Sequence, residues 1–112
     1  MTEKLKTEVE FEVRKGRTFA RIKDFYENGN LAREGVYTNG HGEWNWEIAI
    51  GTVKRYFANG NLKSVERYDE AGSLDGESLF YNDKGMITSK LVYSKDKKIL
   101  EEFYDKDKSR LK

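Results

Sequence analysis

The fold is indicated by a short stretch that occurs twice almost unchanged: Phe25-Tyr26-Glu27-Asn28-Gly29-Asn30-Leu31 and Tyr56-Phe57-Ala58-Asn59-Gly60-Asn61-Leu62. Both stretches begin a longer pattern of an aromatic residue, three residues, a glycine, one residue, Leu or Ile, five residues and a tyrosine. The pattern occupies Phe25 to Tyr37, Tyr56 to Tyr68 and Tyr81 to Tyr93. Such recurrence predicts a stack of supersecondary units, none of which can bury its apolar face alone.

The turn residues predict that each unit is a β-hairpin. Asn28-Gly29 and Asn59-Gly60 lie between runs rich in aromatic and aliphatic residues, and Asn-Gly supplies the positive φ angles of a type I′ turn. A two-residue loop at Asn28-Gly29 would place Tyr26 opposite Leu31. The same loop would place two opposite-charge pairs across the strands, Asp24 with Arg33 and Lys23 with Glu34.

The other two copies follow the same logic. A two-residue loop at Asn59-Gly60 would place Phe57 opposite Leu62, again an aromatic residue against a leucine. In the third copy, Asn82 to Gly85 would form a longer loop that ends in a left-handed glycine. We therefore expect Gly29, Gly60 and Gly85 to be structural turn residues.

The spacing of the copies locates an interruption. Gly60 and Gly85 are 25 residues apart, whereas Gly29 and Gly60 are 31 residues apart. The extra residues between Tyr37 and Tyr56 are assigned to the stretch His41 to Glu47, which holds both tryptophans and the only histidine.

Composition favours one small, shallow domain. The chain has 112 residues, of which 37% are hydrophobic and 37% charged, a thin apolar supply for a two-layer core. It has no cysteine, which excludes a disulfide framework and a cysteine-rich zinc site. Its net charge of +1 provides no bulk field to attract nucleic acid or an anionic membrane. No apolar run reaches the roughly 18 residues of a membrane span, and we expect a cytoplasmic protein.

The N-terminal segment reads as an amphipathic strand. Glutamates alternate with apolar residues from position 8 to position 13, which places carboxylates on one face and apolar side chains on the other. Arg14 to Arg17 would form the following turn, and Thr18 to Tyr26 the returning strand. The glutamates at 8, 10 and 12 are read either as a solvated strand face or as an acidic patch for a basic partner.

Three segments carry a family resemblance: Phe25 to Leu31, Arg55 to Leu62 and Asp75 to Tyr81. They resemble the variant MORN repeat of bacteria, whose consensus is aromatic-aromatic-Glu-Asn-Gly, then Leu-Lys, a tyrosine, a Gly-rich turn and Asp-Gly-Glu. The resemblance covers roughly Arg21 to Tyr93. It implies an elongated antiparallel sheet used as a binding surface and no enzyme, and many such proteins are known as YwqK-type antitoxins or immunity-like proteins.

The predicted fold is therefore all-β, a single elongated antiparallel meander of seven to nine strands built from MORN-like hairpins. We expect residues 1–112 to form a single repeat domain. The predicted repeats span about 19–37, 50–68 and 75–93, with degenerate ends at 7–18 and 99–112.

Catalytic chemistry finds little support in the sequence. A Ser-His-Asp arrangement would have to be built on His41 alone, and Cys-His chemistry is excluded. Glu43 and Glu47 could in principle serve as an acid/base pair or bind a cation, although two acidic residues on a solvated strand face explain them more simply. We expect no catalytic residue, no metal and no cofactor.

The two tryptophans are the strongest candidates for partner contact. Trp44 and Trp46 lie outside the repeat period and would share one face of an extended strand, and tryptophan is enriched at binding hot spots. A local core over the sheet is the equally weighted alternative. The predicted partner-binding residues are Trp44, Trp46, Glu43, Glu47 and His41.

The predicted function is non-catalytic protein binding, as a cytoplasmic antitoxin or immunity protein that neutralises a cognate toxin. One alternative is a general MORN-type scaffold or membrane-associated adaptor. A less favoured alternative is a nucleic-acid or nucleotide binder that stacks bases on its aromatic rings, against which the near-zero net charge argues. The oligomeric state is left open.

Overall fold

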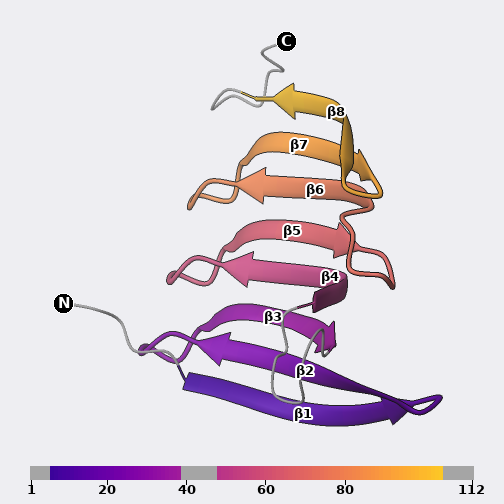
Figure 1. The fold of residues 1–112 in the computed structure, drawn as a ribbon. Helices are drawn as coiled ribbons and strands as arrows, with labels where there is room; N and C mark the ends of the chain where they lie inside the picture. The colour runs from indigo at the N-terminus through magenta and orange to yellow at the C-terminus, as the bar shows by residue number, and fades with distance from the viewer. Residues whose placement is uncertain (1–5, 39–47, 105–112) are drawn as a thin grey trace.

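The computed structural model describes residues 6–38 and 48–104, which form one eight-stranded antiparallel sheet with each strand beside its neighbours in sequence (Figure 1). The described residues contain no helix. The predicted all-β meander is confirmed. The strands are β1 (Lys6–Arg14), β2 (Arg17–Phe25), β3 (Leu31–Thr38), β4 (Ile48–Tyr56), β5 (Leu62–Tyr68), β6 (Gly76–Tyr81), β7 (Ile87–Ser94) and β8 (Lys97–Phe103).

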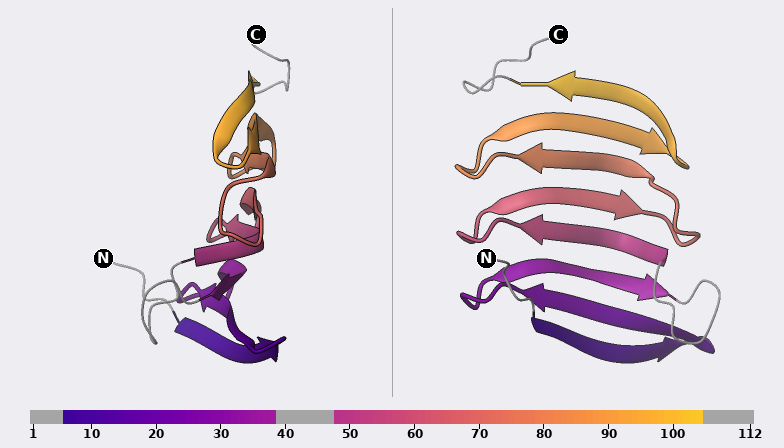
Figure 2. Two further views of the ribbon diagram at one scale, coloured as in Figure 1. Left: turned by 45° about the vertical axis from the view of Figure 1, so that its right-hand side comes forward. Right: turned by 60° about the vertical axis from the view of Figure 1, so that its left-hand side comes forward.

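The eight strands form a single twisted layer (Figure 2). One side, which we call the core face, carries a buried apolar cluster of Ala20, Ile22, Tyr37 and Val53. The other side, which we call the charged face, carries a row in which Glu8, Lys23, Glu34 and Lys54 lie opposite one another across β1 to β4. Charges alternate along this row, so that each pair of neighbours is favourable.

The hairpin turns differ in type from the sequence prediction. The Gly29 N–H donates to the Tyr26 carbonyl at 2.9 Å, and the Tyr26 N–H donates to the Asn30 carbonyl at 2.8 Å. This is a three-residue loop, a turn followed by a left-handed glycine, with Gly29 at φ 94° and Asn28 at negative φ. The predicted two-residue turn is wrong. The Asn28 side chain accepts the Asn30 N–H at 2.8 Å, and this bond stabilises a three-residue loop in which only the glycine needs a positive φ.

A β-bulge corrects the register beyond the loop. Next to the loop, Phe25 lies opposite Leu31 in place of the predicted Tyr26. The register then shifts by one residue between Phe25 and Asp24. Asp24 therefore faces Arg33, and the predicted Lys23–Glu34 pairing is also observed. The second hairpin repeats the change, with Tyr56 in place of Phe57 opposite Leu62.

The third hairpin closes in the same way. The Asn82 N–H donates to the Met86 carbonyl at 2.8 Å, and Gly85 lies at φ 90°. The loop that ends in a left-handed glycine, predicted only for this copy, is thus the form that all three copies adopt.

Asparagine side chains link successive hairpin turns at the ends of the strands. The side-chain amides of Asn28 and Asn30 both donate to the Ala58 carbonyl, at 2.9 and 2.7 Å. One repeat later, Asn59 and Asn61 both donate to the Asp83 carbonyl at 2.9 Å. The repeated Asn-Gly-Asn therefore both closes its own hairpin and binds the next one.

The repeat tyrosines lie opposite small residues. Tyr37 pairs with Ala20, Tyr68 with Gly51 and Tyr93 with Gly76, each tyrosine 17 positions after its partner. The alanine or glycine leaves part of the sheet surface uncovered, and the tyrosine ring in the neighbouring strand packs over it.

The first strand differs from its expected amphipathic burial. Both faces of β1 are exposed, including the apolar residues Val9 at 43%, Phe11 at 59% and Val13 at 67%. The reason is that β1 is the edge strand of a single-layer sheet.

Candidate functional site

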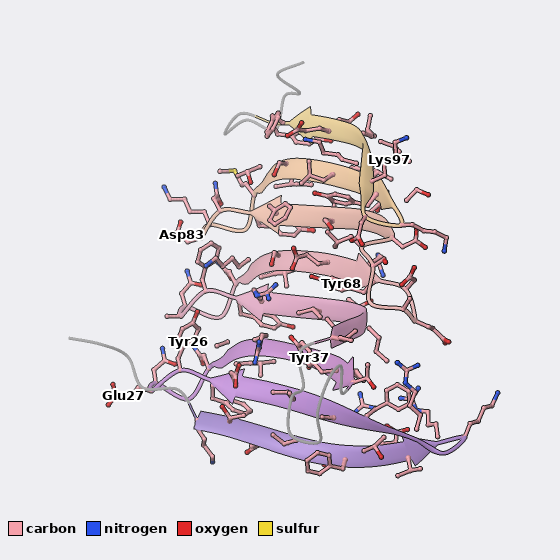
Figure 3. The ribbon with its side chains drawn as sticks, in the orientation of Figure 1. Tyr26, Glu27, Tyr37, Tyr68, Asp83 and Lys97 are labelled. Carbon is pink, nitrogen blue, oxygen red and sulfur yellow. The ribbon has the colours of Figure 1, made fainter. Side chains whose placement is uncertain are left out.

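The core face is hollowed where β3, β4 and β5 lie side by side. The hollow has a volume of about 500 Å³ and is lined by Arg33, Arg55, Tyr37 and Tyr68, with Ile48, Ala49 and Val53 among the remaining lining residues. We call it the arginine hollow. Figure 3 shows Tyr37 on β3 and Tyr68 on β5, with β4 between them. Both tyrosines lie away from the hairpin turns that carry Tyr26 and Asp83.

Arg33 is held by a carboxylate and a ring. Its guanidinium lies 2.7 Å from Asp24 Oδ2, and its centre is 5.3 Å from the centroid of the Tyr37 ring. Asp24 is buried at 8% exposure and also accepts a 2.7 Å hydrogen bond from the Thr7 hydroxyl. The Arg33 Nε atom is buried and has no hydrogen-bond partner within the described residues.

Arg55 lies directly opposite Arg33 in the neighbouring strand. Two like charges in this position repel, and the repulsion is offset because the Arg55 guanidinium is also paired with Glu66 on β5. Burial, together with the nearby Glu66 carboxylate, raises the pKa of Tyr68 above its ordinary value.

The hollow is rich in cationic groups but balanced in charge. Its two guanidiniums are matched by the carboxylates of Asp24 and Glu66. A phosphate or nucleic-acid site depends on uncompensated positive charge, which this arrangement does not provide. Arginine and tyrosine beside apolar side chains are instead typical of the central residues of protein interfaces.

The charged face has a smaller hollow, of about 330 Å³, over β2 to β4. At its side, the Tyr56 hydroxyl donates to Glu34 Oε2 at 2.9 Å. Burial, reinforced by this hydrogen bond and the Glu34 charge, raises the pKa of Tyr56 to about 12. Glu34 also lies between two lysines across the strands, Lys23 on β2 and Lys54 on β4.

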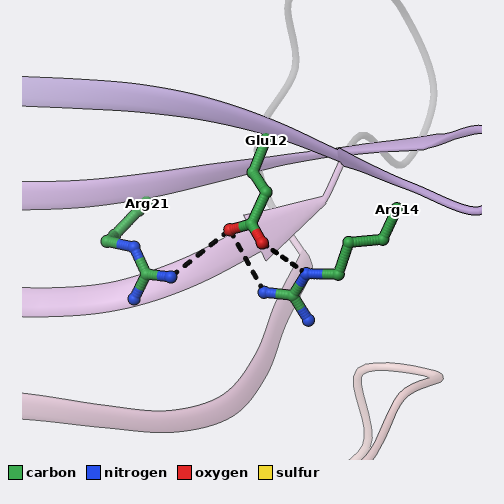
Figure 4. Close-up of polar contacts among 3 residues, drawn as sticks. All are labelled: Glu12, Arg14 and Arg21. Carbon is green, nitrogen blue, oxygen red and sulfur yellow. Dashed lines mark hydrogen bonds and ion pairs between the residues drawn. The ribbon is translucent and has the colours of Figure 1, made fainter.

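The N-terminal glutamates are likewise compensated. Arg14 Nε donates to Glu12 Oε2 at 2.8 Å, and Arg21 contacts Glu12 Oε1 at 3.3 Å (Figure 4). The hydrogen bond from Arg14 is the main cause that lowers the pKa of Glu12. Glu8 and Glu10 lie opposite Lys23 and Arg21. This strand face therefore does not form a free acidic patch.

The predicted partner-binding residues lie outside the described residues: Trp44, Trp46, Glu43, Glu47 and His41. The described strands that flank this segment contribute to the arginine hollow, since Tyr37 precedes it and Ile48 follows it. The predicted turn glycines, Gly29, Gly60 and Gly85, lie at φ 94°, 97° and 90°.

The arginine hollow is not foreseen by the sequence pattern. That pattern identifies Tyr37 and Tyr68 only as repeat positions, and it does not single out Arg33 and Arg55 as a pair. The one available signal is the position of the two arginines, each inside a hairpin and on either side of the interrupted repeat. Over the described ranges, no group of three or more His, Asp or Glu side chains could hold a metal ion. The same ranges hold no helix that is long and apolar enough to span a membrane.

The structure defines a repetitive β-meander whose core face carries the arginine hollow. Within the meander, residues 21–39 and 50–70 match the MORN repeat variant. These segments correspond to the β2–β3 and β4–β5 hairpins, and the match supports the predicted MORN-repeat architecture; the third copy lies outside it. No curated protein and no solved structure matches the chain significantly.

Proposed function

We propose that this chain is a non-catalytic protein-binding module whose partner docks on the arginine hollow. MORN repeats generally serve as protein- or membrane-binding modules. The observation that carries the proposal is the arrangement of Arg33, Arg55, Tyr37 and Tyr68 around one hollow of about 500 Å³. Its balanced charge favours a protein surface over a polyanion.

The finer proposal is that the partner is a toxin, which this protein neutralises by covering its active surface in the cytoplasm. This antitoxin or immunity role is the one that the sequence resemblance of the repeats implies. In this proposal, the segment with Trp44 and Trp46 adds to the same interface, because it joins the two strands that carry Tyr37 and Ile48.

The test compares two exchanges that each remove one ion pair without changing net charge. Arg55→Gln/Glu66→Gln alters the hollow, and Lys90→Gln/Glu77→Gln removes a 3.2 Å pair between β7 and β6 on the charged face. We expect the first variant to lose partner capture and the second to retain it, with unchanged circular dichroism for both. Equal capture by both variants would place the interface elsewhere.

The toxin role requires a separate readout. Cells expressing the cognate toxin should grow when they also express the wild-type chain or the Lys90/Glu77 control, and should not grow with the hollow variant. A Trp44→Ala/Trp46→Ala variant that stays folded should also fail to protect. Protection by the tryptophan variant at the wild-type level would remove that segment from the interface.

A membrane adaptor is the second candidate, because MORN repeats in general include membrane-binding modules. Sedimentation with vesicles of anionic phospholipid separates it from protein binding. The compensated charges of both faces predict no binding at physiological salt. Binding that is lost at high salt would favour the adaptor over the toxin inhibitor.

A further inference from the structure

The last strand of the sheet, β8, has a self-complementary sequence. Its first six residues are Lys97-Lys98-Ile99-Leu100-Glu101-Glu102, two lysines, two aliphatic residues and two glutamates. Against a second copy that runs in the opposite direction, each lysine falls opposite a glutamate. Opposite charges directly across antiparallel strands stabilise the pair, and like charges destabilise it.

A dimer of this kind imposes a condition on the strand faces. When two edge strands join into one continuous antiparallel sheet, the two-fold axis is perpendicular to the sheet, so each residue keeps its face. Residues opposite each other must therefore share a face. Lys98 and Glu101 are three positions apart, and residues three apart in a regular strand point to opposite faces. A regular β8 could not pair with itself in this register.

A β-bulge in β8 removes the obstacle. Lys98 faces Tyr93, and Leu100 faces Val92, although Tyr93 and Val92 are adjacent in β7. Ile99 is thus an extra residue without a partner of its own, and the face alternation is reset between Lys98 and Leu100.

The reset brings each lysine onto the face of its complementary glutamate. Lys98 and Glu101 share one face, where Nζ and Oε1 form a 2.8 Å ion pair within the chain. Lys97, Leu100 and Glu102 share the other face, because they oppose alternate residues of β7. The charge pattern and the face pattern are therefore compatible with the same two-fold axis.

The strand is also accessible. In the described part of the chain, β8 pairs with β7 alone, at the end of the strand order. Its residues from Lys97 to Glu101 are exposed, including Ile99 at 60% and Leu100 at 42%. The edge thus combines two exposed aliphatic side chains with an open row of backbone groups, which is a template for strand addition.

We propose that β8 is a homodimer interface, in which two copies pair these strands antiparallel about a two-fold axis at Leu100. Lys98 of each copy faces Glu101 of the other, and Lys97 faces Glu102. The two Leu100 side chains meet on the axis. The Lys98–Glu101 pair seen within the chain is exchanged for the same pair between chains, and the sheet becomes continuous across both copies.

The other edge of the sheet has the opposite character. If β1 paired with itself around Glu10, Glu8 would lie opposite Glu12, and Lys6 would lie opposite Arg14. Like charges directly opposite each other destabilise such a pairing. In this register the charges of β1 oppose self-pairing, whereas those of β8 favour it.

The first test is the mass of the full chain in solution. An interface of one short strand is far smaller than those of stable dimers, so we expect a reversible monomer–dimer equilibrium between about 10 µM and about 1 mM. Added salt should weaken the dimer, since exposed ion pairs are screened. Sedimentation equilibrium measures both effects, and a monomer at every concentration would overturn the proposal.

The second test reverses charges in pairs. Lys97→Glu/Lys98→Glu makes the edge entirely acidic, and Glu101→Lys/Glu102→Lys makes it entirely basic. Each variant alone should show a dissociation constant raised at least about tenfold, because four favourable pairs become repulsive. An equimolar mixture should form a heterodimer. The matched control reverses all four charges and should dimerise as the wild type does.

Three results would contradict the interface. These are undiminished association of the acidic variant, no heterodimer in the mixture, or a mass that grows beyond the dimer, as expected if β8 added to β1 of the next copy. Circular dichroism establishes that each variant is folded. If a charge variant does not fold, Leu100→Arg decides, because it places two like charges on the axis and should abolish the dimer.

Discussion

The side-chain amide of Asn28 donates a 2.9 Å hydrogen bond to the carbonyl of Ala58, 30 residues further along the chain. The same asparagine accepts the backbone N–H of Asn30 through its Oδ1 atom. One side chain thus closes a hairpin and fastens it to the next, so turn chemistry and repeat stacking are supplied by the same residue.

This double role predicts the effect of Asn28→Asp. An aspartate keeps the acceptor for the Asn30 N–H but has no amide to donate to Ala58. We expect a loss of about 0.5–1.5 kcal/mol in the free energy of unfolding, the usual range for one hydrogen bond. Urea denaturation measures it.

The control for that variant is Asn82→Asp in the third turn. Asn82 accepts two backbone N–H groups, from Lys84 and Met86, as Asp69 does from Ala71 and Ser73 in the β5–β6 turn. The substitution should therefore be nearly neutral. Equal destabilisation by the two variants would mean that the bond between turns contributes nothing.

Gly35→Ala should destabilise the core face. An added Cβ would lie 2.9 Å from Val53 Cγ2 and 3.3 Å from the Tyr37 ring, and Val53 is almost fully buried. Such overpacking typically costs about 1–3 kcal/mol. Thermal unfolding of Gly35→Ala, Val53→Ala and the double variant should show that the second change partly relieves the first. Strict additivity would contradict the close contact.

Gly60→Val should destabilise through the backbone. Gly60 lies at φ 97°, and a Cβ added there would meet only the Asn30 amide nitrogen, at 3.9 Å. A β-branched residue at positive φ is strained by about 1–3 kcal/mol. Gly60→Asn should cost less, because asparagine tolerates positive φ better. If both variants melted at the wild-type temperature, the left-handed turn would not be limiting for stability.

The raised pKa of Tyr56 predicts a loss of stability at high pH. Its pKa is raised from the ordinary value of 10.0 to about 12 in the folded protein, so its contribution is complete below pH 10 and is lost as the pH rises toward 12. The reason is that the unfolded chain releases the phenolic proton first. The free energy of unfolding should fall less steeply between these pH values in Tyr56→Phe than in the wild type.

Glu34→Gln tests the cause of that shift. It keeps an acceptor for the Tyr56 hydroxyl, 2.9 Å away, and removes the neighbouring negative charge. The pH dependence should become shallower, but less so than in Tyr56→Phe, because burial is the larger cause of the shift. A slope equal to that of the wild type would mean that the Glu34 charge contributes nothing, which leaves burial and the retained hydrogen bond as the causes.

The hairpins could be predicted because their signals are local. Asn-Gly between apolar runs places a turn at Gly29 and Gly60 whatever the rest of the chain does, and the predicted pairing of Asp24 with Arg33 is confirmed. The loop length differs from the prediction because one more residue in the loop is offset by a bulge in the strand. The longer loop and the bulge cancel, so the strand register beyond the bulge is the one that the two-residue loop predicts. The sequence pattern alone detects neither the longer loop nor the bulge.

The candidate site could not be predicted for the opposite reason. Arg33 and Arg55 are neighbours only because β3 and β4 pair across an interrupted repeat, and their register depends on contacts between distant strands. Side-chain alternation is lost whenever such an irregularity intervenes.

The sequence by itself determined the repeating hairpins and the all-β meander, since turn residues and a regular period act over a few neighbouring residues. It also contains the self-complementary charges of β8, two lysines followed by two glutamates. Only the tertiary structure decided which of these residues share a face. Ile99 is an extra residue because of how β8 pairs with β7, and that pairing alone places Lys98 beside Glu101. A bulge moves every later side chain to the other face of the sheet, so its position depends on strand pairing rather than on local sequence.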